Sequence, residues 1–268
     1  MDLSKEKSAW EIVEIARNKK RKTSLDFIEK IFDDFIELHG DRNFKDDKAI
    51  VCGLGSINGE AYTIIAEQKG RTTKENIERN FGMPNPESYR KAIRFMKQAE
   101  KFNRPIITFI DTKGAYPGIG AEERGQGEAI AKSLFEMSKV RVPTIAIVIG
   151  EGSSGGALAI SVADRIFMLE NAIYSILSPE GYGSILWKDS SRYKEAAEKM
   201  KLTAKDLYEL KVIDKIIEED EEFEKTALSL KKEIIETMKV FNSKDRECLL
   251  DERYSKYRNM GEYVELGV

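Results

Sequence analysis

Two glycine-rich turns, each placed directly after a short apolar run, constrain the fold more than any other feature of the sequence. The first run is Pro105–Asp111 (PIITFID), and it is followed by the turn Asp111–Gly120. The second run is Pro143–Gly150 (PTIAIVIG), followed by the turn Gly150–Ala157 and an expected helix over Ala157–Val162. Short β-branched runs bounded by glycine are typical of buried strands. Their repetition at a spacing of about 40 residues predicts stacked β/α units with parallel strands.

The segments before the first turn predict a helix, a hairpin and a second helix. Apolar residues at helical spacing predict a helix over Leu25–His39, with a capping box formed by Thr23 and Asp26 and a stop at Gly40. The pair Asn58-Gly59 indicates a hairpin turn between two strand-like runs. A polar, turn-rich stretch follows before the second helix. These further elements are expected at Ala49–Leu54, Ala61–Ala66, the loop Lys69–Pro86 and the helix Tyr89–Ala99.

The remaining segments complete an α/β pattern without a low-complexity linker. We expect a helix at Glu128–Val140, strands at Arg165–Leu169 and Ile173–Leu177, and a helical, acidic chain from Ser191 onward. This pattern predicts one main α/β domain over residues 1–268. Its parts are a helical N-terminal segment (about 1–45), a core (about 46–216) and a helical C-terminal segment (about 217–268).

Composition bounds the class of protein. Of the 268 residues, 41% are apolar and 34% are charged, and the net charge of −3 gives no electrostatic argument for a nucleic-acid partner. Cys52 and Cys248 match no metal-ligand spacing, so we expect no metal site and no disulfide framework in this chain. No apolar run has the length of a signal sequence or a membrane span, which favours a cytoplasmic protein without a membrane partner.

The glycine turns suggest a chemistry. Glycines and a proline after a buried strand leave backbone amides without side-chain cover, and amides at a helix N-terminus carry the positive end of the helix dipole. Such amides suit an anion or a developing oxyanion. Two other interpretations are open. The turns could bind phosphate, although neither GxGxxG nor GxxxxGK[ST] is present, or the glycines could only permit close packing.

Residues that usually carry catalysis are scarce. The only histidine, His39, is expected at a helix end, where capping accounts for it. Ser153 and Ser154 lie in the second turn, and a serine hydrolase would have to recruit His39 from a remote segment. A chemistry that stabilises oxyanions without a protein nucleophile fits these residues better.

Five segments together closely resemble one protein family. They read ELHGDR (37–42), RNFGMPNPESYRKA (79–92), DTKGAYPGIGAEERGQGEAIA (111–131), GEGSSGGALAI (150–160) and SPEGYGSILWKD (178–189). The family is the carboxyltransferase alpha subunit of bacterial acetyl-coenzyme A carboxylase. The resemblance runs in the same order from about Trp10 to Ile216.

The resemblance implies a crotonase-like (ClpP/crotonase) fold of stacked ββα units with helical extensions at both termini. It implies an enzyme, a biotin-dependent carboxyltransferase. Such an enzyme moves the carboxyl group of carboxybiotin, carried on the biotin carboxyl carrier protein, to acetyl-CoA. The product is malonyl-CoA, in the first committed step of fatty acid biosynthesis. The expected partners are a carboxyltransferase beta subunit in an alpha2beta2 heterotetramer, the carrier protein and biotin carboxylase, within an ATP-dependent complex. No cofactor is expected to be bound permanently, and zinc is expected only in the beta subunit.

The resemblance also implies roles for residues in the two turns and in the segment SPEGYGSILWKD (178–189). The backbone amides of Gly156 and Ala157, with the adjoining Gly155, are expected to form the oxyanion hole on the biotin ureido oxygen. The thioester oxyanion is expected to be held mainly by the beta subunit. Binding of substrate and biotin is expected at Gly114, Ala115, Tyr116, Gly118, Gly152, Ser153, Ser154, Glu180 and Gly181.

Two charged segments keep two interpretations each. Glu122, Glu123 and Arg124 could contact a ligand or form a charge network at a helix start. The segment Lys69–Lys101, with nine Lys or Arg residues against four Glu residues, could meet coenzyme A phosphates or form a solvated face.

The chain departs from the family pattern at several positions. Lys113 replaces a usual proline, and Tyr182 is bulkier than the usual residue at its position. The usual N-terminal extension is largely missing. A usual Gly-Gly-Ala-His stretch is replaced by the acidic segment Glu218–Glu222. Two alternatives therefore stand beside the leading hypothesis: a carboxyltransferase subunit of another biotin-dependent acyl-CoA carboxylase or of a malonate decarboxylase, and a non-catalytic scaffold paralogue.

Overall fold

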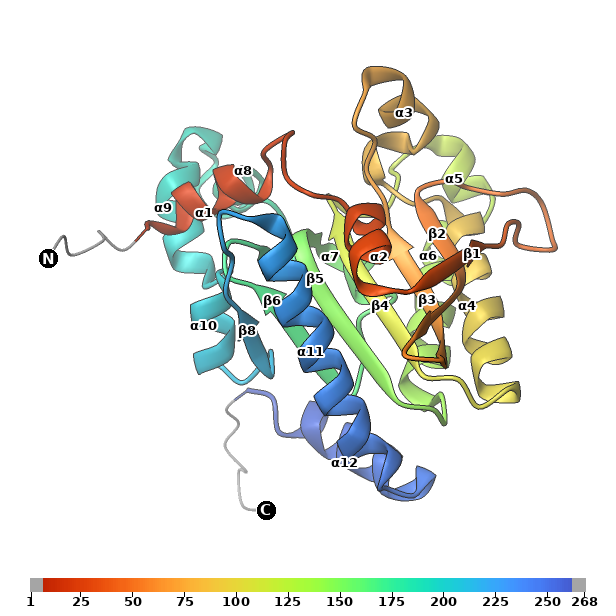
Figure 1. The fold of residues 1–268 in the computed structure, drawn as a ribbon. Coiled ribbons are helices and arrows are strands. Elements are labelled where there is room, and N and C mark those ends of the chain that lie inside the picture. The colour runs from red at the N-terminus through yellow and green to blue at the C-terminus, as the bar shows by residue number, and fades with distance from the viewer. Residues whose placement is uncertain (1–6, 262–268) are drawn as a thin grey trace, which may run out of the picture.

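A mixed eight-stranded sheet forms the centre of the protein (Figure 1). The computed structural model describes residues 7–261. The strands are β1 (Asp34–Glu37), β2 (Ile50–Ile57), β3 (Glu60–Glu67), β4 (Ile106–Thr112), β5 (Thr144–Ser153), β6 (Arg165–Leu169), β7 (Ile173–Ser175) and β8 (Lys215–Ile217). Their order is β1-β2-β3-β4-β5-β6-β8, and β7 pairs with the last residues of β5.

The strand directions confirm the predicted hairpin and the predicted β/α units. β2 and β3 pair antiparallel across the Asn58-Gly59 turn, and both residues have positive φ, as such a turn requires. From β3 through β4, β5 and β6 to β8 every pairing is parallel. The carboxyl ends of parallel strands meet at one edge of a sheet. The two glycine turns, which follow β4 and β5, therefore lie at the same edge.

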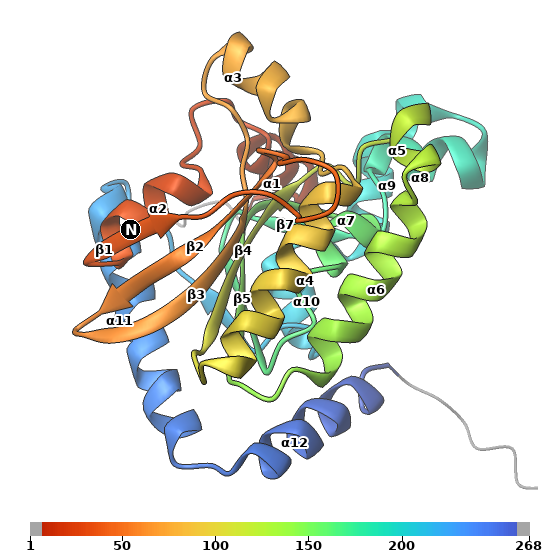
Figure 2. The ribbon, with the colours of Figure 1, turned by 90° about the vertical axis from the view of Figure 1, so that its right-hand side faces the viewer.

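Helices cover both faces of the sheet (Figure 2). Helices α4 and α6 pack together on one face, and α2 and α11 pack together on the other. The helices of the described chain are α1 (Ala9–Ala16), α2 (Ser24–Ile31), α3 (Thr73–Glu78), α4 (Pro86–Lys101), α5 (Ile119–Glu123), α6 (Gln126–Lys139), α7 (Ser154–Leu158), α8 (Pro179–Tyr182), α9 (Tyr193–Met200), α10 (Ala204–Glu209), α11 (Phe223–Asn242) and α12 (Arg246–Arg258). Short turns of other helix types are η1 (Asn80–Gly82), η2 (Gly183–Trp187) and η3 (Ser190–Arg192).

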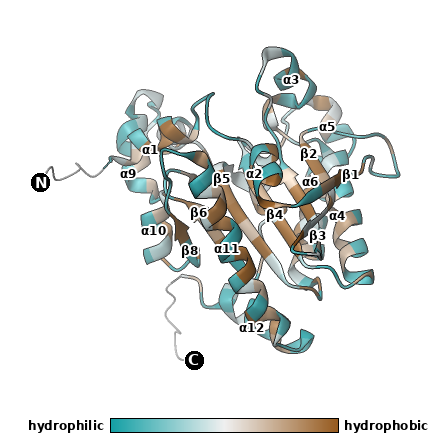
Figure 3. Cartoon of the chain, viewed as in Figure 1, coloured by the Kyte–Doolittle hydropathy of each residue, from teal (hydrophilic) through white to brown (hydrophobic). Residues whose placement is uncertain are grey.

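The hydropathy pattern explains why the central strands are buried. β4 and β5 are buried along their whole length, and Figure 3 shows apolar residues concentrated on the sheet and on the inner side of α11. Strands covered on both faces read as continuous apolar runs rather than alternating ones, and PIITFID and PTIAIVIG are such runs.

The predicted helix Leu25–His39 is correct only in its first half. The capping box of Thr23 and Asp26 is present, but the helix ends at Ile31. Residues Asp34–Glu37 form β1 and pair with β2, so the predicted stop at Gly40 is wrong and His39 does not lie in a helix. The apolar spacing continued past Ile31, but pairing with a distant strand overrode it.

The C-terminal helix α12 is fixed by one buried arginine. Arg253 forms two hydrogen bonds of 2.8 Å to the carboxylate of Asp164, and its guanidinium also donates to the carbonyls of Val140 and Val142. These partners lie at or before the first residues of β5 and β6, so α12 packs at the sheet edge opposite the glycine turns (Figure 1). No helix of the described residues is long and apolar enough to cross a membrane.

Candidate functional site

The two glycine turns are in direct backbone contact. In the pairing of β4 with β5, Thr112 lies beside Gly152. A Cβ atom on Gly156 would lie 2.6 Å from the backbone nitrogen of Ala115 and 2.7 Å from the carbonyl carbon of Gly114. Gly114 itself has φ of +129°, a conformation that favours glycine. Glycine is therefore required at 156 so that the second turn can lie against the first.

Helix α7 begins earlier than the sequence predicts. It spans Ser154–Leu158 rather than Ala157–Val162, and Ser153 is its N-cap residue. In a helix that begins there, the amides of Ser154, Gly155 and Gly156 have no intrahelical acceptor, whereas Ala157 occupies the position where helical hydrogen bonding starts. Ser154 has φ of +59°, which marks a sharp change of direction between β5 and α7. The free amides thus lie at the point where the second turn meets the first.

The first turn is held open by hydrogen bonds to neighbouring segments. Gly114 N donates to Thr112 Oγ1 (3.1 Å), and Tyr116 N donates to the carbonyl of Pro84 (3.0 Å). The buried Gln126 side chain donates to the carbonyl of Tyr116. The ring of Tyr116 covers Gly118, where an added Cβ would approach the ring to 2.3 Å. These contacts give the turn a fixed shape, as a pocket wall needs.

An apolar cavity adjoins the start of α7. Its volume is about 340 Å³. It is lined by Ser154, Gly155, Leu158, Tyr174, Ser175, Ile176, Leu207 and Val212. Ile176 is 79% exposed and Leu158 is 40% exposed, so the cavity opens onto a surface with uncovered apolar side chains. A flat apolar group that carries one polar oxygen could lie here, with that oxygen toward the free amides.

Glu180 and Gly181 lie in α8 rather than in the turns. Gly181 N is capped by Ser178 Oγ (3.0 Å), and Glu180 accepts from Arg17 Nη1 (2.8 Å). Arg17 also donates from Nε to Glu151 in β5 (2.9 Å). Glu180 is therefore connected to the second turn through an arginine, and its own carboxylate is already paired.

The other motif residues divide into paired and exposed ones. Arg124 is ion-paired with the buried Glu87 and donates to the carbonyl of Gly120, which supports the charge-network interpretation for that residue. Lys113 is exposed and lines a second cavity of about 500 Å³ on the side of the first turn that faces the segment between α1 and α2. The ring of Tyr182 packs edge-on against Trp187 at a centroid distance of 5.4 Å.

The serine-hydrolase interpretation finds no support in the geometry. His39 follows the edge strand β1 and its Nδ1 lies 3.1 Å from Asp46. Ser154 follows β5, which is separated from β1 by three strands of the sheet. Within residues 7–261, no group of three or more His, Cys, Asp or Glu residues is placed to hold a metal ion.

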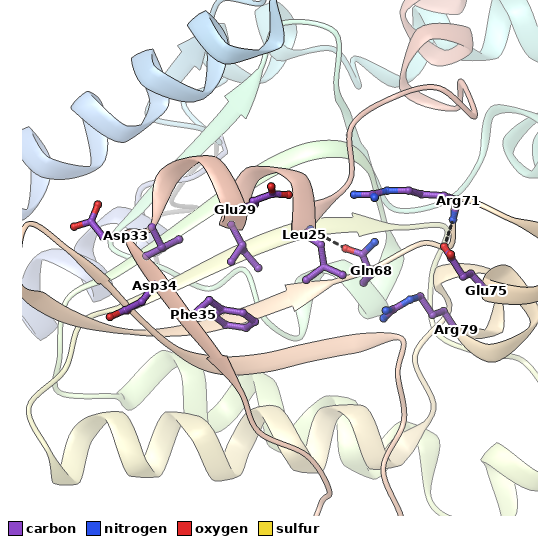
Figure 4. Close-up of a pocket in the computed structure, with 11 residues that line it drawn as sticks. Leu25, Glu29, Asp33, Asp34, Phe35, Gln68, Arg71, Glu75 and Arg79 are labelled. Carbon is purple, nitrogen blue, oxygen red and sulfur yellow. Dashed lines mark hydrogen bonds between the residues drawn. The ribbon is translucent and has the colours of Figure 1, made fainter.

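A groove of about 540 Å³ lies between α2, β1 and α3 (Figure 4). In it Gln68 accepts from the backbone nitrogen of Leu25, and the backbone nitrogen of Arg71 donates to Glu75. Neither glycine turn contributes a residue to this groove. Although this groove is large, it lies away from both glycine turns, so it is not the candidate site.

A buried carboxyl group lies behind the first turn. Glu67, at the end of β3, is fully buried and accepts from the backbone nitrogen of Asp111 (3.0 Å). Burial, together with the nearby carboxylate of Asp111, raises the pKa of Glu67 well above its usual range, despite the hydrogen bond from the Asp111 amide. The folded protein thus favours the neutral form of Glu67.

We expect the substitution Glu67→Gln to reduce the loss of stability at higher pH. An acid whose pKa is higher in the folded state destabilises that state as the pH rises above the unfolded pKa of about 4.3. Glutamine keeps an acceptor for the Asp111 amide and cannot ionise. The free energy of unfolding, measured by denaturant titration at about pH 5 and about pH 8, should fall more for the wild type than for the variant. Parallel pH dependence in the two proteins would contradict this account of Glu67.

Sequence reasoning missed the side chains that support the turns. Arg17, Glu67 and Lys69 lie outside the five family segments, and Glu151 lies in GEGSSGGALAI but was given no role. Their partners lie far away in the sequence. The apolar lining at Tyr174 and Ile176 was read only as part of a strand.

Comparisons with known proteins place this geometry in a family. A family model described as "Acetyl co-enzyme A carboxylase carboxyltransferase-like" matches residues 2–261. A protein of Clostridium beijerinckii named acetyl-coenzyme A carboxylase carboxyl transferase subunit alpha is 60% identical over 259 residues, which cover 95% of each chain. The chain belongs to this family. A protein of the same name from Staphylococcus haemolyticus is 56% identical, over 96% of this chain and 83% of that protein's length.

Other relatives of the family are longer than this chain. A protein of Natranaerobius thermophilus named for both the beta and alpha subunits is 57% identical over 97% of this chain, but only 44% of its own length is covered. Among solved structures, a transcarboxylase 12S superimposes with a TM-score of 0.72 at 20% identity, over 96% of this chain and 47% of that one. A malonate decarboxylase hetero-tetramer gives a TM-score of 0.70 at 14% identity, over 87% of this chain and 92% of that one. These structures confirm the crotonase-like α/β fold class.

Proposed function

We propose that this chain is the alpha subunit of an acetyl-CoA carboxylase carboxyltransferase, which transfers a carboxyl group from carboxybiotin to acetyl-CoA to give malonyl-CoA. The observation that carries the proposal is the identity of 60% to a relative of that name over 95% of both chains. The site agrees with it, because free amides at the start of α7 adjoin an apolar cavity, and His39, the only histidine of the sequence, follows β1 and is separated from β5 by three strands.

The chain's own residues would position a substrate rather than exchange protons with it. The carboxybiotin carried on its carrier protein supplies the carboxyl group and, once this is released, a basic ureido nitrogen. The amides of Gly155 and Gly156 are our candidates for holding the ureido oxygen, with Ala157 next to them. Such donors stabilise negative charge in a site from which water is excluded. Gly114, Ala115, Tyr116 and Gly118 form the facing wall, while Gly152 and Ser153 set the direction of α7.

The apolar cavity fits the group that this function requires. Biotin is a compact, largely apolar ring system with one carbonyl oxygen, and a cavity lined by Leu158, Tyr174, Ile176 and Val212 beside free amides provides both environments. We assign Ser154 to the rim of this cavity. We assign a supporting role to Glu180 and Gly181, because their helix α8 is connected to the second turn through Arg17.

A partner subunit would complete the site. The relative that is named for both subunits joins a beta part and an alpha part in one polypeptide, which supports direct contact between the two. We propose an alpha2beta2 assembly that works with a biotin carboxyl carrier protein and a biotin carboxylase in the cytoplasm. Zinc, where present, would belong to the beta subunit. The exposed apolar side chains at the cavity mouth fit a surface that a partner covers.

The test is a substrate comparison on the assembled complex. The chain is co-purified with the beta subunit of the same organism, and decarboxylation of malonyl-CoA and of methylmalonyl-CoA is measured in the presence of biocytin. The proposal expects biocytin-dependent turnover that is faster with malonyl-CoA. Faster turnover of methylmalonyl-CoA would favour another biotin-dependent carboxylase, and a complex without turnover on either substrate would favour a scaffold.

A further inference from the structure

A cluster of buried charged side chains lies behind the two glycine turns. Glu67, Asp111 and Glu151 stand at the carboxyl ends of the adjacent strands β3, β4 and β5, and their exposed fractions are 0%, 5% and 4%. Acidic side chains are seldom buried without a partner, because removing a charge from water is costly. Because Glu67 favours its neutral form, the two residues that require a counter-charge are Asp111 and Glu151, on the neighbouring strands β4 and β5.

Lys69 supplies that charge between two of the strands. It lies just beyond β3, with its Nζ 2.6 Å from Asp111 Oδ1 and 3.9 Å from Glu151 Oε2. The same Oδ1 of Asp111 also accepts from the backbone nitrogen of Glu151 (2.9 Å). A single carboxylate oxygen thus accepts from the Lys69 ammonium and from the backbone of the next strand. Asp111 is the first residue of the first glycine turn, and Glu151 is the second residue of the second turn.

The glycines around this cluster make the contact possible. A Cβ on Gly150 would lie 2.3 Å from Asp111 Oδ1, and a Cβ on Gly82 would lie 2.6 Å from Lys69 Cγ. Gly82 also accepts from Thr112 Oγ1 (2.6 Å) through its carbonyl. The aliphatic part of the Lys69 side chain therefore packs directly against Gly82, and the Asp111 carboxylate packs directly against Gly150.

Arg17 extends the cluster to the segment between α1 and α2. Its guanidinium joins Glu151 to Glu180, so the carboxyl end of β5 is connected to α8. Of the three buried acids, Arg17 contacts Glu151. Lys69, in contrast, lies between Asp111 of β4 and Glu151 of β5. Lys69 is the cation placed where the two turns start.

We propose that Lys69 is a positioning residue for the carboxyl transfer reaction: its ammonium group holds the ends of β4 and β5 together so that Gly114 and Gly156 remain in contact. The proposal rests on the proposed function for its catalytic consequence. Without the ammonium group, Glu151 keeps its ion pair with Arg17, but the buried carboxylate of Asp111 loses the Lys69 cation. A buried carboxylate without a counter-charge shifts toward solvent or another donor. Because Asp111 Oδ1 also accepts from the backbone nitrogen of Glu151, that shift moves the starts of both turns.

The substitution Lys69→Met tests this role, and two variants control it. Lys69→Arg keeps the charge, and the open cavity of about 500 Å³ that Lys69 lines leaves room for the longer side chain. Lys256→Met removes a matched ion pair: Lys256 pairs with Asp214 at the opposite edge of the sheet, and its side chain is 13% exposed, against 19% for Lys69. All three variants are made in the full chain and purified with the beta subunit.

Two readouts separate positioning from general stability. The first is kcat and KM for biocytin-dependent malonyl-CoA decarboxylation. The second is hydrogen exchange of the amides in residues 113–118 and 152–157. For Lys69→Met we expect kcat to fall by about 10²-fold with little change in KM for malonyl-CoA, because misplacement of the reacting groups by about 1 Å has that effect. We also expect faster exchange in both turns. Lys69→Arg should restore most of the turnover, and Lys256→Met should change neither readout.

The outcomes are distinguishable from a failure of the proposed function. A wild-type complex without turnover would refute the proposed function. Whether Lys69 orders the turns would then be decided by comparing hydrogen exchange in the turns of the wild type and of Lys69→Met. Unchanged exchange in the turns of Lys69→Met would overturn the proposal. The proposal would also be overturned if the turns of Lys69→Met exchanged faster while its kcat stayed at the wild-type value. It would be overturned as well if Lys256→Met lost as much kcat as Lys69→Met.

Discussion

The substitution Gly156→Val is expected to abolish measurable turnover of the complex, with a loss of at least about 10²–10³-fold in kcat. A Cβ at this position would lie 2.6 Å from the Ala115 nitrogen and 2.7 Å from the Gly114 carbonyl carbon. Both contacts are to backbone, which cannot rotate away as a side chain can. The second turn must therefore move off the first, and the amides at the start of α7 move with it.

A matched glycine on a helix surface controls this result. Gly127→Ala places a Cβ where no heavy atom lies within 4 Å, so turnover should remain at the wild-type level. Gly156→Ala should show a smaller loss than Gly156→Val, because it adds fewer atoms to the same contact. Association with the beta subunit, followed by co-purification, should persist in all three variants. Full activity in a Gly156→Val complex would remove the second turn from the active site.

The substitution Ile176→Asp is expected to weaken the partner complex by about 30-fold or more in Kd, as the loss of an apolar anchor of about 2 kcal/mol does. Ile176 is 79% exposed at the mouth of the cavity beside α7, so the isolated chain makes little use of it. An aspartate placed there would be buried without a counter-charge when a partner covers the surface. Titration of the labelled chain with the beta subunit measures the change.

An exposed leucine far from the cavity provides the control for this variant. Leu228 on α11 is 61% exposed, and Leu228→Asp should leave the Kd unchanged. Thermal unfolding of both isolated variants should stay close to that of the wild type, because surface substitutions change stability by about 0.5 kcal/mol or less. A wild-type Kd for Ile176→Asp would show that the cavity mouth is not part of the interface.

Local signals were sufficient to predict six of the eight strands and the two turns. The other two strands, β1 and β8, lie in segments that the sequence predicted to be helical. The runs before Asp111 and Gly150 are apolar and β-branched, and Asn58-Gly59 has the conformation that its turn type demands. These features depend on neighbouring residues, so periodicity and turn chemistry detect them. The family resemblance then located the turns in a known arrangement of strands.

Long-range pairing was beyond the reach of the same signals. Phe35 and Ile36 continue the helical spacing of α2, yet they belong to a strand because Asp34–Glu37 pairs with Gly53–Ser56 of β2. The start of α7 was placed three residues too late, because β5 and the helix meet at Ser154 in a left-handed conformation that apolar spacing does not report.

The charge cluster behind the turns shows the limit most clearly. Lys69 and Asp111 are 42 residues apart, and Arg17 and Glu151 are 134 residues apart, so no window of sequence contains both partners. In the sequence alone, Lys69 is one of nine basic residues in Lys69–Lys101, a segment that fits either a solvated face or a phosphate contact. Its partners are carboxylates that become neighbours only when β3, β4 and β5 form a sheet.

The most direct test of a shared active site is a titration of the beta subunit into a fixed concentration of this chain, with the rate of biocytin-dependent malonyl-CoA decarboxylation as the readout. We predict no detectable rate without the beta subunit, and a rate that rises and saturates at one beta subunit per chain. A full rate from the isolated chain, or no rate at any ratio despite a stable complex, would contradict the account.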